Sequence, residues 1–88
     1  MPNIRQQEKR VRSAARERLQ NLRYRSTVKT LTKRLRVAVD EGDMAKIAEE
    51  HRALVRAVDK AASKGALHRN TAARRKAQAA RLVSGASR

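Results

Sequence analysis

The sequence predicts an all-α fold: a three-helix up-down-up bundle with an overlong, basic N-terminal helix. Three observations predict it. Pro2 is the sole proline, the three glycines Gly42, Gly65 and Gly85 separate long stretches without helix breakers, and no segment alternates apolar and polar residues as a strand does. With 88 residues, the chain is short enough for a single domain.

The first stretch, residues 3–41, predicts a helix of about 58 Å, longer than so small a domain can cover. Asn3 is placed to cap its start. Large apolar residues are sparse before residue 19 and then recur at helical spacing, with Tyr24 filling one gap. The predicted stripe is Leu19, Leu22, Val28, Leu31, Leu35, Ala38 and Val39. We therefore expect residues 1–18 to project as a basic arm and residues 19–83 to form the bundle.

The second helix is expected over residues 43–64, with Asp43 as its N-cap and Gly65 in the C-cap position. It carries the most regular apolar stripe in the chain. This stripe is Met44, Ile47, Ala48, His51, Leu54, Val55, Val58 and Ala62.

The third helix is expected from Asn70, as N-cap, to about Val83. Its packing face is predicted to consist of small residues. These are Ala72, Ala73, Ala77 and Ala80, followed by Leu82. Residues 84–88 are expected to be a frayed tail.

Composition excludes several classes of protein. The chain has no cysteine, which removes disulfide scaffolds and thiolate metal sites, and His51 and His68 do not form a metal-binding pattern. Alanine supplies 16 of the hydrophobic residues, so the core is too small to enclose a substrate or cofactor pocket. We expect no enzyme, no cofactor, no small-molecule substrate and no homo-oligomer. No apolar run is long enough to span a membrane.

The charge favours a polyanionic partner. The chain has 23 Lys and Arg against 8 Asp and Glu, a formal net charge of +15. Residues 1–25 and 64–88 carry most of the excess, whereas residues 43–63 are balanced. Nucleic acid is the most common partner of such a distribution.

Cations on the first helix follow helical spacing, so they form rows along it. Like charges four apart destabilise an isolated helix, and binding a nucleic-acid backbone would remove this repulsion. The predicted contacts here are Arg5, Lys9, Arg10, Arg12, Arg16, Arg18, Arg23, Arg25, Lys29 and Lys33.

The start of the third helix combines basic side chains with the positive end of a helix dipole. This arrangement is unfavourable alone but suits bound phosphates. The predicted contacts are His68, Arg69, Arg74, Arg75, Lys76 and, further along, Arg81.

Residues 59–76 resemble the signature of the bacterial small-subunit ribosomal protein S20 family. The core of the resemblance is Lys-Gly-x-Leu-His-Arg-Asn-x-Ala-Ala-Arg-Arg-Lys, which begins at Lys64. The basic opening and the Gly42-Asp43 turn are also similar. The resemblance implies a cytoplasmic, ribosome-bound protein that binds 16S ribosomal RNA directly and helps to assemble the small (30S) subunit. It adds Lys64 and Asn70 to the expected RNA contacts.

Two other hypotheses are open. The charge alone would also suit a nucleoid-type protein that coats DNA without sequence preference, although no dimer seam or minor-groove wedge is visible. A cationic amphipath on a membrane surface would need bulky apolar residues, and the chain has neither Trp nor Phe.

Overall fold

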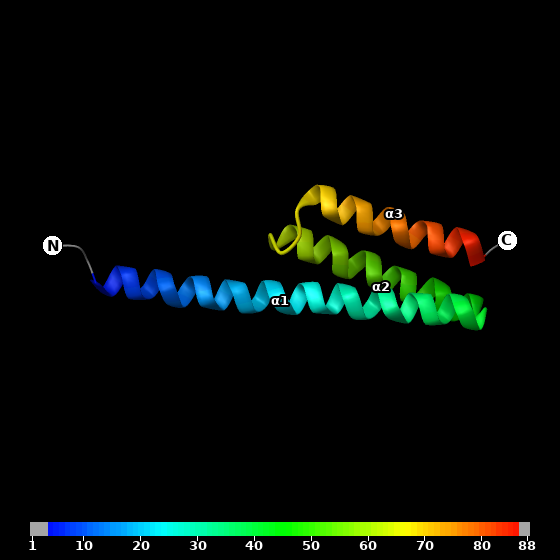
Figure 1. Ribbon diagram of the computed structural model, residues 1–88, viewed down its shortest axis with the longest axis horizontal. Helices are drawn as coiled ribbons and strands as arrows, with labels where there is room; N and C mark the ends of the chain where they lie inside the picture. Colours follow the sequence, from blue (N-terminus) through cyan, green and yellow to red (C-terminus); the bar gives the residue numbers. More distant parts are fainter. Residues whose placement is uncertain (1–3, 87–88) are drawn as a thin grey trace.

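A computed structural model describes residues 4–86, which form three helices: α1 (Ile4–Glu41), α2 (Met44–Ser63) and α3 (Arg69–Ala86). The helices run up, down and up, each packs against the other two, and the described residues contain no strand (Figure 1). The predicted fold class is therefore confirmed. The predicted cap at Asn3 lies outside the described residues.

The molecule is a rod because α1 is about twice as long as its neighbours. Its extents are 66 × 20 × 13 Å, and its radius of gyration is 17.4 Å. A compact chain of this length would have a radius of gyration of about 12 Å. Figure 1 shows α1 running well beyond α2 and α3 on the side of the N-terminus.

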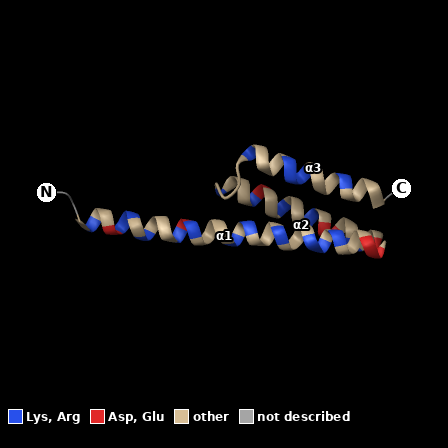
Figure 2. Cartoon of the chain, viewed as in Figure 1, with Lys and Arg blue, Asp and Glu red and all other residues tan. Residues whose placement is uncertain are grey.

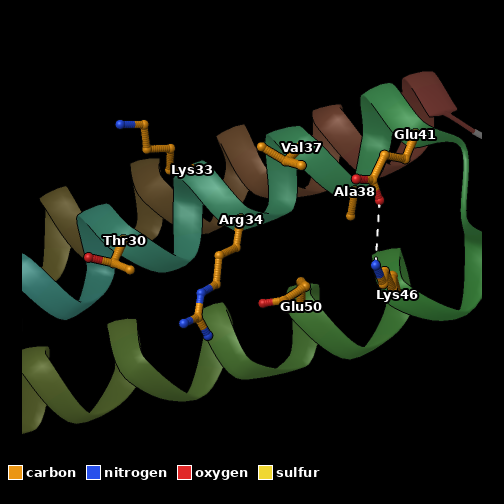
Figure 3. A pocket seen from close by; sticks show the side chains of 8 residues that line it. All are labelled: Thr30, Lys33, Arg34, Val37, Ala38, Glu41, Lys46 and Glu50. Carbon is orange, nitrogen blue, oxygen red and sulfur yellow. Dashed lines mark ion pairs between the residues drawn. The ribbon is translucent and has the colours of Figure 1, made fainter.

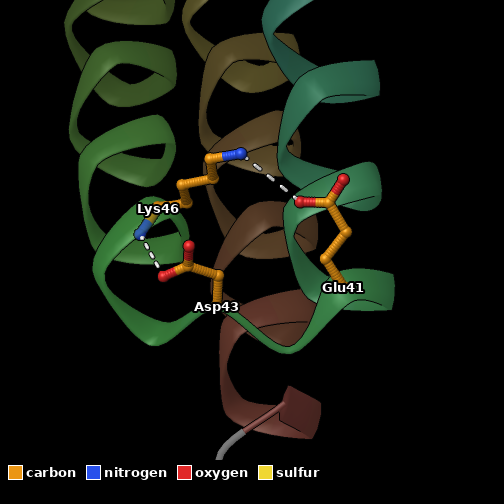
Figure 4. Close-up of polar contacts among 3 residues, drawn as sticks. All are labelled: Glu41, Asp43 and Lys46. Atoms are coloured by element: carbon orange, nitrogen blue, oxygen red, sulfur yellow. Dashed lines mark hydrogen bonds and ion pairs between the residues drawn. The ribbon is translucent and has the colours of Figure 1, made fainter.

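The turn between α1 and α2 is short and doubly capped (Figure 4). Gly42 has a φ of 72°, the left-handed conformation that ends many helices, and its N–H donates to the Ala38 carbonyl at 3.0 Å. The Asp43 carboxylate then accepts from the Lys46 N–H at 3.2 Å. The Lys46 ammonium lies 3.6 Å from Glu41 across the turn. The predicted N-cap at Asp43 is confirmed.

A Schellman motif ends α2 and sets the direction of the chain into α3. Gly65, with a φ of 76°, donates its N–H to the Ala62 carbonyl at 3.1 Å. The Ala66 N–H donates to the Ala61 carbonyl at 2.8 Å, and both of these alanines are buried. The predicted C-terminal role of Gly65 is confirmed.

The core is small and made of aliphatic side chains. Leu35 from α1 and Ile47, Leu54 and Val58 from α2 are its large, fully buried members. Small residues complete it: Val28, Ala38, Ala61, Ala66, Ala72 and Ala79. Tyr24 packs at its edge and is half-buried.

Part of the predicted apolar stripe on α1 is not in the core. Leu19 is 51% exposed and Leu22 is 59% exposed. The reason is the length of α2, which has 20 residues and covers about 30 Å of α1, counted back from the turn. Leu19 lies beyond that reach and Leu22 lies at its limit. Met44, predicted on the α2 stripe, is also exposed, at 54%.

The packing face of α3 differs from the predicted one. Ala73, Ala77 and Ala80 are exposed, whereas Ala72 and Ala79 are buried. The inward face steps by four and three through residues 72, 76, 79, 83 and 86, so it includes a lysine that the alanine pattern concealed. The helix also continues to Ala86, three residues past its predicted end.

Charge is unevenly placed along the rod. Lys and Arg are spread over α1 and α3, and acidic residues gather near the α1–α2 turn, at the end away from the projecting segment (Figure 2). Five of the eight acidic residues lie between positions 40 and 50: Asp40, Glu41, Asp43, Glu49 and Glu50.

Candidate nucleic-acid interface

All the side chains predicted to contact nucleic acid are exposed except Lys76, which is half-buried. They lie on α1, on α3 and in the loop that connects α2 to α3. Their exposure leaves the charged groups open to a partner, and their positions on the helices decide which of them can act together.

A first row of cations follows the projecting part of α1. Its members are Arg5, Lys9, Arg12, Arg16 and Arg23, spaced by four, three, four and seven residues. Every side chain from Ile4 to Gln20 is exposed, so no other helix covers this row. Glu8 pairs with Arg12 at 3.8 Å, but both side chains are well exposed, so this ion pair contributes little.

A second row lies on a different face of α1. Its members are Arg18, Arg25, Lys29 and Lys33, spaced by seven, four and four residues. Arg16 and Arg18, neighbours from the two rows, are about 200° apart around the axis at 3.6 residues per turn. Arg10 belongs to neither row.

Arg25 in the second row also holds the bundle together. Its Nε donates to the Ala66 carbonyl at 3.0 Å, across 41 residues of sequence. This bond ties the middle of α1 to the α2–α3 loop and fixes the direction of the side chain. Sequence reasoning identified the charge of Arg25 but not this contact, because a backbone acceptor leaves no mark in the sequence.

Three consecutive cations on α3 point in three directions, because successive helical residues differ by about 100°. Arg74 is exposed and lies on the same face as Arg81, seven residues later. Arg75 faces α1 and lines a hollow with Lys29. Lys76 lies against α2, where its ammonium is 2.9 Å from a carboxylate oxygen of Asp59.

The start of α3 differs from the predicted one. The helix begins at Arg69, so His68, the residue before it, lies in the capping position in place of Asn70. The His68 Nδ1 accepts from the Asn70 N–H at 3.1 Å, and the Ala72 N–H donates to the His68 carbonyl. Asn70 therefore lies inside the first turn. No acidic residue lies in this turn to offset the positive end of the helix, and Arg69 is exposed there.

Neither a metal-binding cluster nor a membrane-spanning helix is found among the described residues. Between positions 4 and 86 there is no group of three His, Cys, Asp or Glu side chains that could hold a metal ion. Within the same range, no helix has the length and apolar character needed to cross a bilayer.

Sequence reasoning missed the apolar and neutral neighbours of the second cation row. Leu22, Ser26 and Leu67 border Arg25, Lys29 and Arg75 around one hollow. A signal for Leu22 was present, since a 20-residue α2 cannot cover all of a 38-residue α1. The position of Leu67 depends on the path of the loop, which the sequence pattern does not specify.

Comparisons with known proteins agree on one family. The family model described as "Ribosomal protein S20" matches residues 2–84. A protein of Kocuria rhizophila named small ribosomal subunit protein bS20 is 43% identical, over 96% of this chain and 98% of its own length. A protein of the same name from Mycobacterium sp. (strain JLS) is 47% identical, over 86% of this chain and 88% of its own length. Another from Acaryochloris marina is 42% identical, over 99% of this chain and 100% of its own length.

Proposed function

The chain belongs to the ribosomal protein S20 family, and on that premise we propose that it binds 16S ribosomal RNA directly and stabilises the folded RNA during assembly of the small (30S) subunit. The family is one of structural ribosomal proteins, so the chain is not an enzyme. The resemblance found in the signature at residues 64–76 is thereby confirmed as family membership. The proposal places the protein in the cytoplasm, on the ribosome.

One observation carries the proposal beyond the family: exposed cations line two faces of one rod. The row that contains Arg12 and the row that contains Arg25 are directed differently around α1. A single straight duplex can contact one such face. Folded RNA can offer phosphates to both, because its helices approach one another from different directions.

The mechanism follows from charge. Phosphates repel each other where RNA helices come together, and Lys and Arg side chains placed between them lower this repulsion. A-form RNA hides its major-groove edges, so contacts to phosphates and 2′-hydroxyls dominate over base reading. The chain would therefore recognise the shape of the folded RNA, and α1, once its projecting half is ordered by binding, would hold the contacting phosphates in place.

The test is competition binding between folded 16S ribosomal RNA and duplex DNA of equal phosphate count. Binding of the full chain is measured at about 50 and about 200 mM salt, an interval over which nonspecific phosphate binding weakens steeply. We expect the ribosomal RNA to win by orders of magnitude at the higher salt.

Equal competition by the two polymers, with both lost at the higher salt, would contradict the proposal. That outcome would favour the nucleoid-type hypothesis, in which the chain responds to charge density alone. Binding to neutral or anionic vesicles at the higher salt would instead revive the membrane-surface hypothesis.

A further inference from the structure

A hollow lies where α1, the α2–α3 loop and the first half of α3 meet. Its volume is about 320 Å³, in the range of small ligand sites, and it is open to solvent. Three cations border it, Arg25 and Lys29 from α1 and Arg75 from α3. The other lining residues are Leu22, Ser26, Val28 and Leu67.

The positive charge of this hollow is not balanced by the protein. No acidic residue lines it, and its three cations take no part in the ion pairs formed among residues 4–86. The hollow between α1 and α2 is different (Figure 3). There Glu41 and Glu50 are among the lining residues, and Lys46 is already paired with Glu41. Lys33 and Arg34 also line the second hollow, but its two carboxylates offset most of the positive charge. An anion is therefore favoured more strongly in the first hollow, where no carboxylate offsets the cations.

Arg25 is oriented before any ligand arrives. Its Nε is committed to the Ala66 carbonyl at 3.0 Å, which leaves both Nη groups available. The acceptor is itself fixed, because Ala66 is 2% exposed and its N–H is bonded to Ala61. A guanidinium held in this way loses little rotamer entropy on binding, and its paired N–H groups fit two oxygens of one phosphate.

The neutral neighbours indicate which phosphate-containing ligand fits. Leu22 is 59% exposed beside the cations, Leu67 is half-buried, and the buried Val28 lies beneath them. Exposed aliphatic carbons at the edge of a cationic site suit the apolar face of a sugar attached to the phosphate. The Ser26 hydroxyl can donate to a phosphate oxygen or accept from a ribose 2′-hydroxyl.

We propose that this hollow is a preformed seat for one backbone phosphodiester of the bound RNA together with its ribose. Arg25 holds the phosphate through its Nη groups, Lys29 and Arg75 neutralise it from either side, and Leu22 and Leu67 contact the sugar. The inference rests on the proposed function and adds to it the residues that act on one shared phosphate.

The experiment measures the affinity of the full chain for 16S ribosomal RNA at about 200 mM salt, where specific contacts dominate. The variants Lys29→Gln and Arg75→Gln remove charge from the hollow without removing a bond inside the protein. The matched control is Arg56→Gln, an exposed cation on α2 that lines a separate surface depression. We expect about tenfold weaker binding for each hollow variant and less than about a twofold change for the control.

Two further measurements separate a shared seat from scattered charges. In the double variant Lys29→Gln/Arg75→Gln, the loss should be smaller than the product of the single losses, because both cations act on one phosphate. Arg25→Lys keeps the charge but loses the guanidinium fork, so it cannot offer paired N–H groups to one phosphate from the orientation that the bond to Ala66 fixes. It should weaken binding about fivefold with no change in the salt slope. Circular dichroism melting confirms that each variant is folded.

Losses for Lys29→Gln and Arg75→Gln no greater than that of Arg56→Gln would overturn the seat, as would multiplicative losses in the double variant. Tight, saturable binding of inorganic phosphate, with no selective loss of RNA binding in Arg75→Gln, would assign the hollow to a free anion instead. A failure of the proposed function would give a different result from these outcomes. In the competition experiment, 16S ribosomal RNA and duplex DNA would then compete equally for the unmodified chain.

Discussion

At the scale of single residues, His68 closes the first turn of α3 with its ring. The ordinary preference for Asn, Asp, Ser or Thr at the N-cap points to Asn70, which lies two residues further on. A histidine can do the same work, because the Nδ1 of a neutral ring accepts a hydrogen bond. The capping preference ranks residue types, but it does not say which residue immediately precedes the helix, and in the structure that residue is His68.

Replacement of His68 tests the cap. His68→Ala leaves the Asn70 N–H without its acceptor, so the free energy of unfolding should fall by about 1 kcal/mol. His68→Asn restores an acceptor at the same position and should recover most of this loss. Urea denaturation of the RNA-free chain measures both. Equal stability of the wild type and the two variants would contradict the cap.

The predicted contact residues Arg74, Arg75 and Lys76 are equivalent in the sequence but not in the structure. Arg74 and Arg75 are exposed, whereas Lys76 is paired with Asp59 at 2.9 Å. A row of basic letters cannot reveal this difference, because the partner lies 17 residues earlier on another helix.

The salt dependence of RNA binding should separate these three cations. Arg74→Gln/Arg75→Gln should flatten the slope of log affinity against log salt by about two units, and adding Lys76→Gln should change it little further. Asp59→Asn frees Lys76 and should steepen the slope. If Lys76→Gln alone flattened it by about one unit, Lys76 would be an RNA contact despite its ion pair.

At the scale of elements, α1 consists of two physically different halves within one uninterrupted helix. Its second half buries Leu35 completely, and its first half buries no side chain. The apolar stripe predicted on this helix begins at Leu19, but Leu19 is 51% exposed and the first buried side chain of the stripe is Val28. The point on α1 where burial begins depends on how far α2 reaches back along it. The apolar pattern of α1 gives no information about the length of α2.

A matched pair of leucine truncations on α1 tests the division. Leu35→Ala should lower the free energy of unfolding by about 3 kcal/mol, because it leaves a cavity in a small core. Leu19→Ala is the same chemical change at a side chain that is 51% exposed, and it should change stability by less than about 0.5 kcal/mol. Thermal and urea unfolding compare the two. Similar losses would mean that Leu19 is buried in solution.

The projecting half of α1 should be the least stable part of the free protein. Residues 5–16 carry closely spaced like charges and bury no apolar surface, so their helix opens easily. Hydrogen exchange should show these amides unprotected in the free chain and protected when 16S ribosomal RNA is bound. Full protection of residues 5–16 without RNA would contradict this expectation.

Removal of residues 1–18 is the complementary test. The melting temperature of the bundle should hardly change, since no described side chain in this segment is buried. The salt slope of RNA binding should flatten by about five units if each of its six cations neutralises one phosphate.

At the scale of the whole molecule, the fold class was predictable because three glycines and one proline divide the chain into helical stretches. The sequence did not predict that Arg25, Lys29 and Arg75 line the same hollow. This arrangement depends on how α1 and α3 are rotated about their axes, and the misassigned alanine face of α3 shows that a face of small residues does not determine that rotation. Charge therefore indicates a polyanionic partner, and packing decides which cations lie close together.

The acidic α1–α2 turn has a consequence for how the rod meets its partner. Negative charge at one end and a projecting cationic segment at the other give the molecule a large electric dipole moment along its 66 Å axis. In the field of a polyanion this dipole exerts a torque that turns the acidic end away, so collisions occur with the projecting end leading. Orientation is then selected during diffusion, before any hydrogen bond forms, and fewer encounters are lost to wrongly turned approaches.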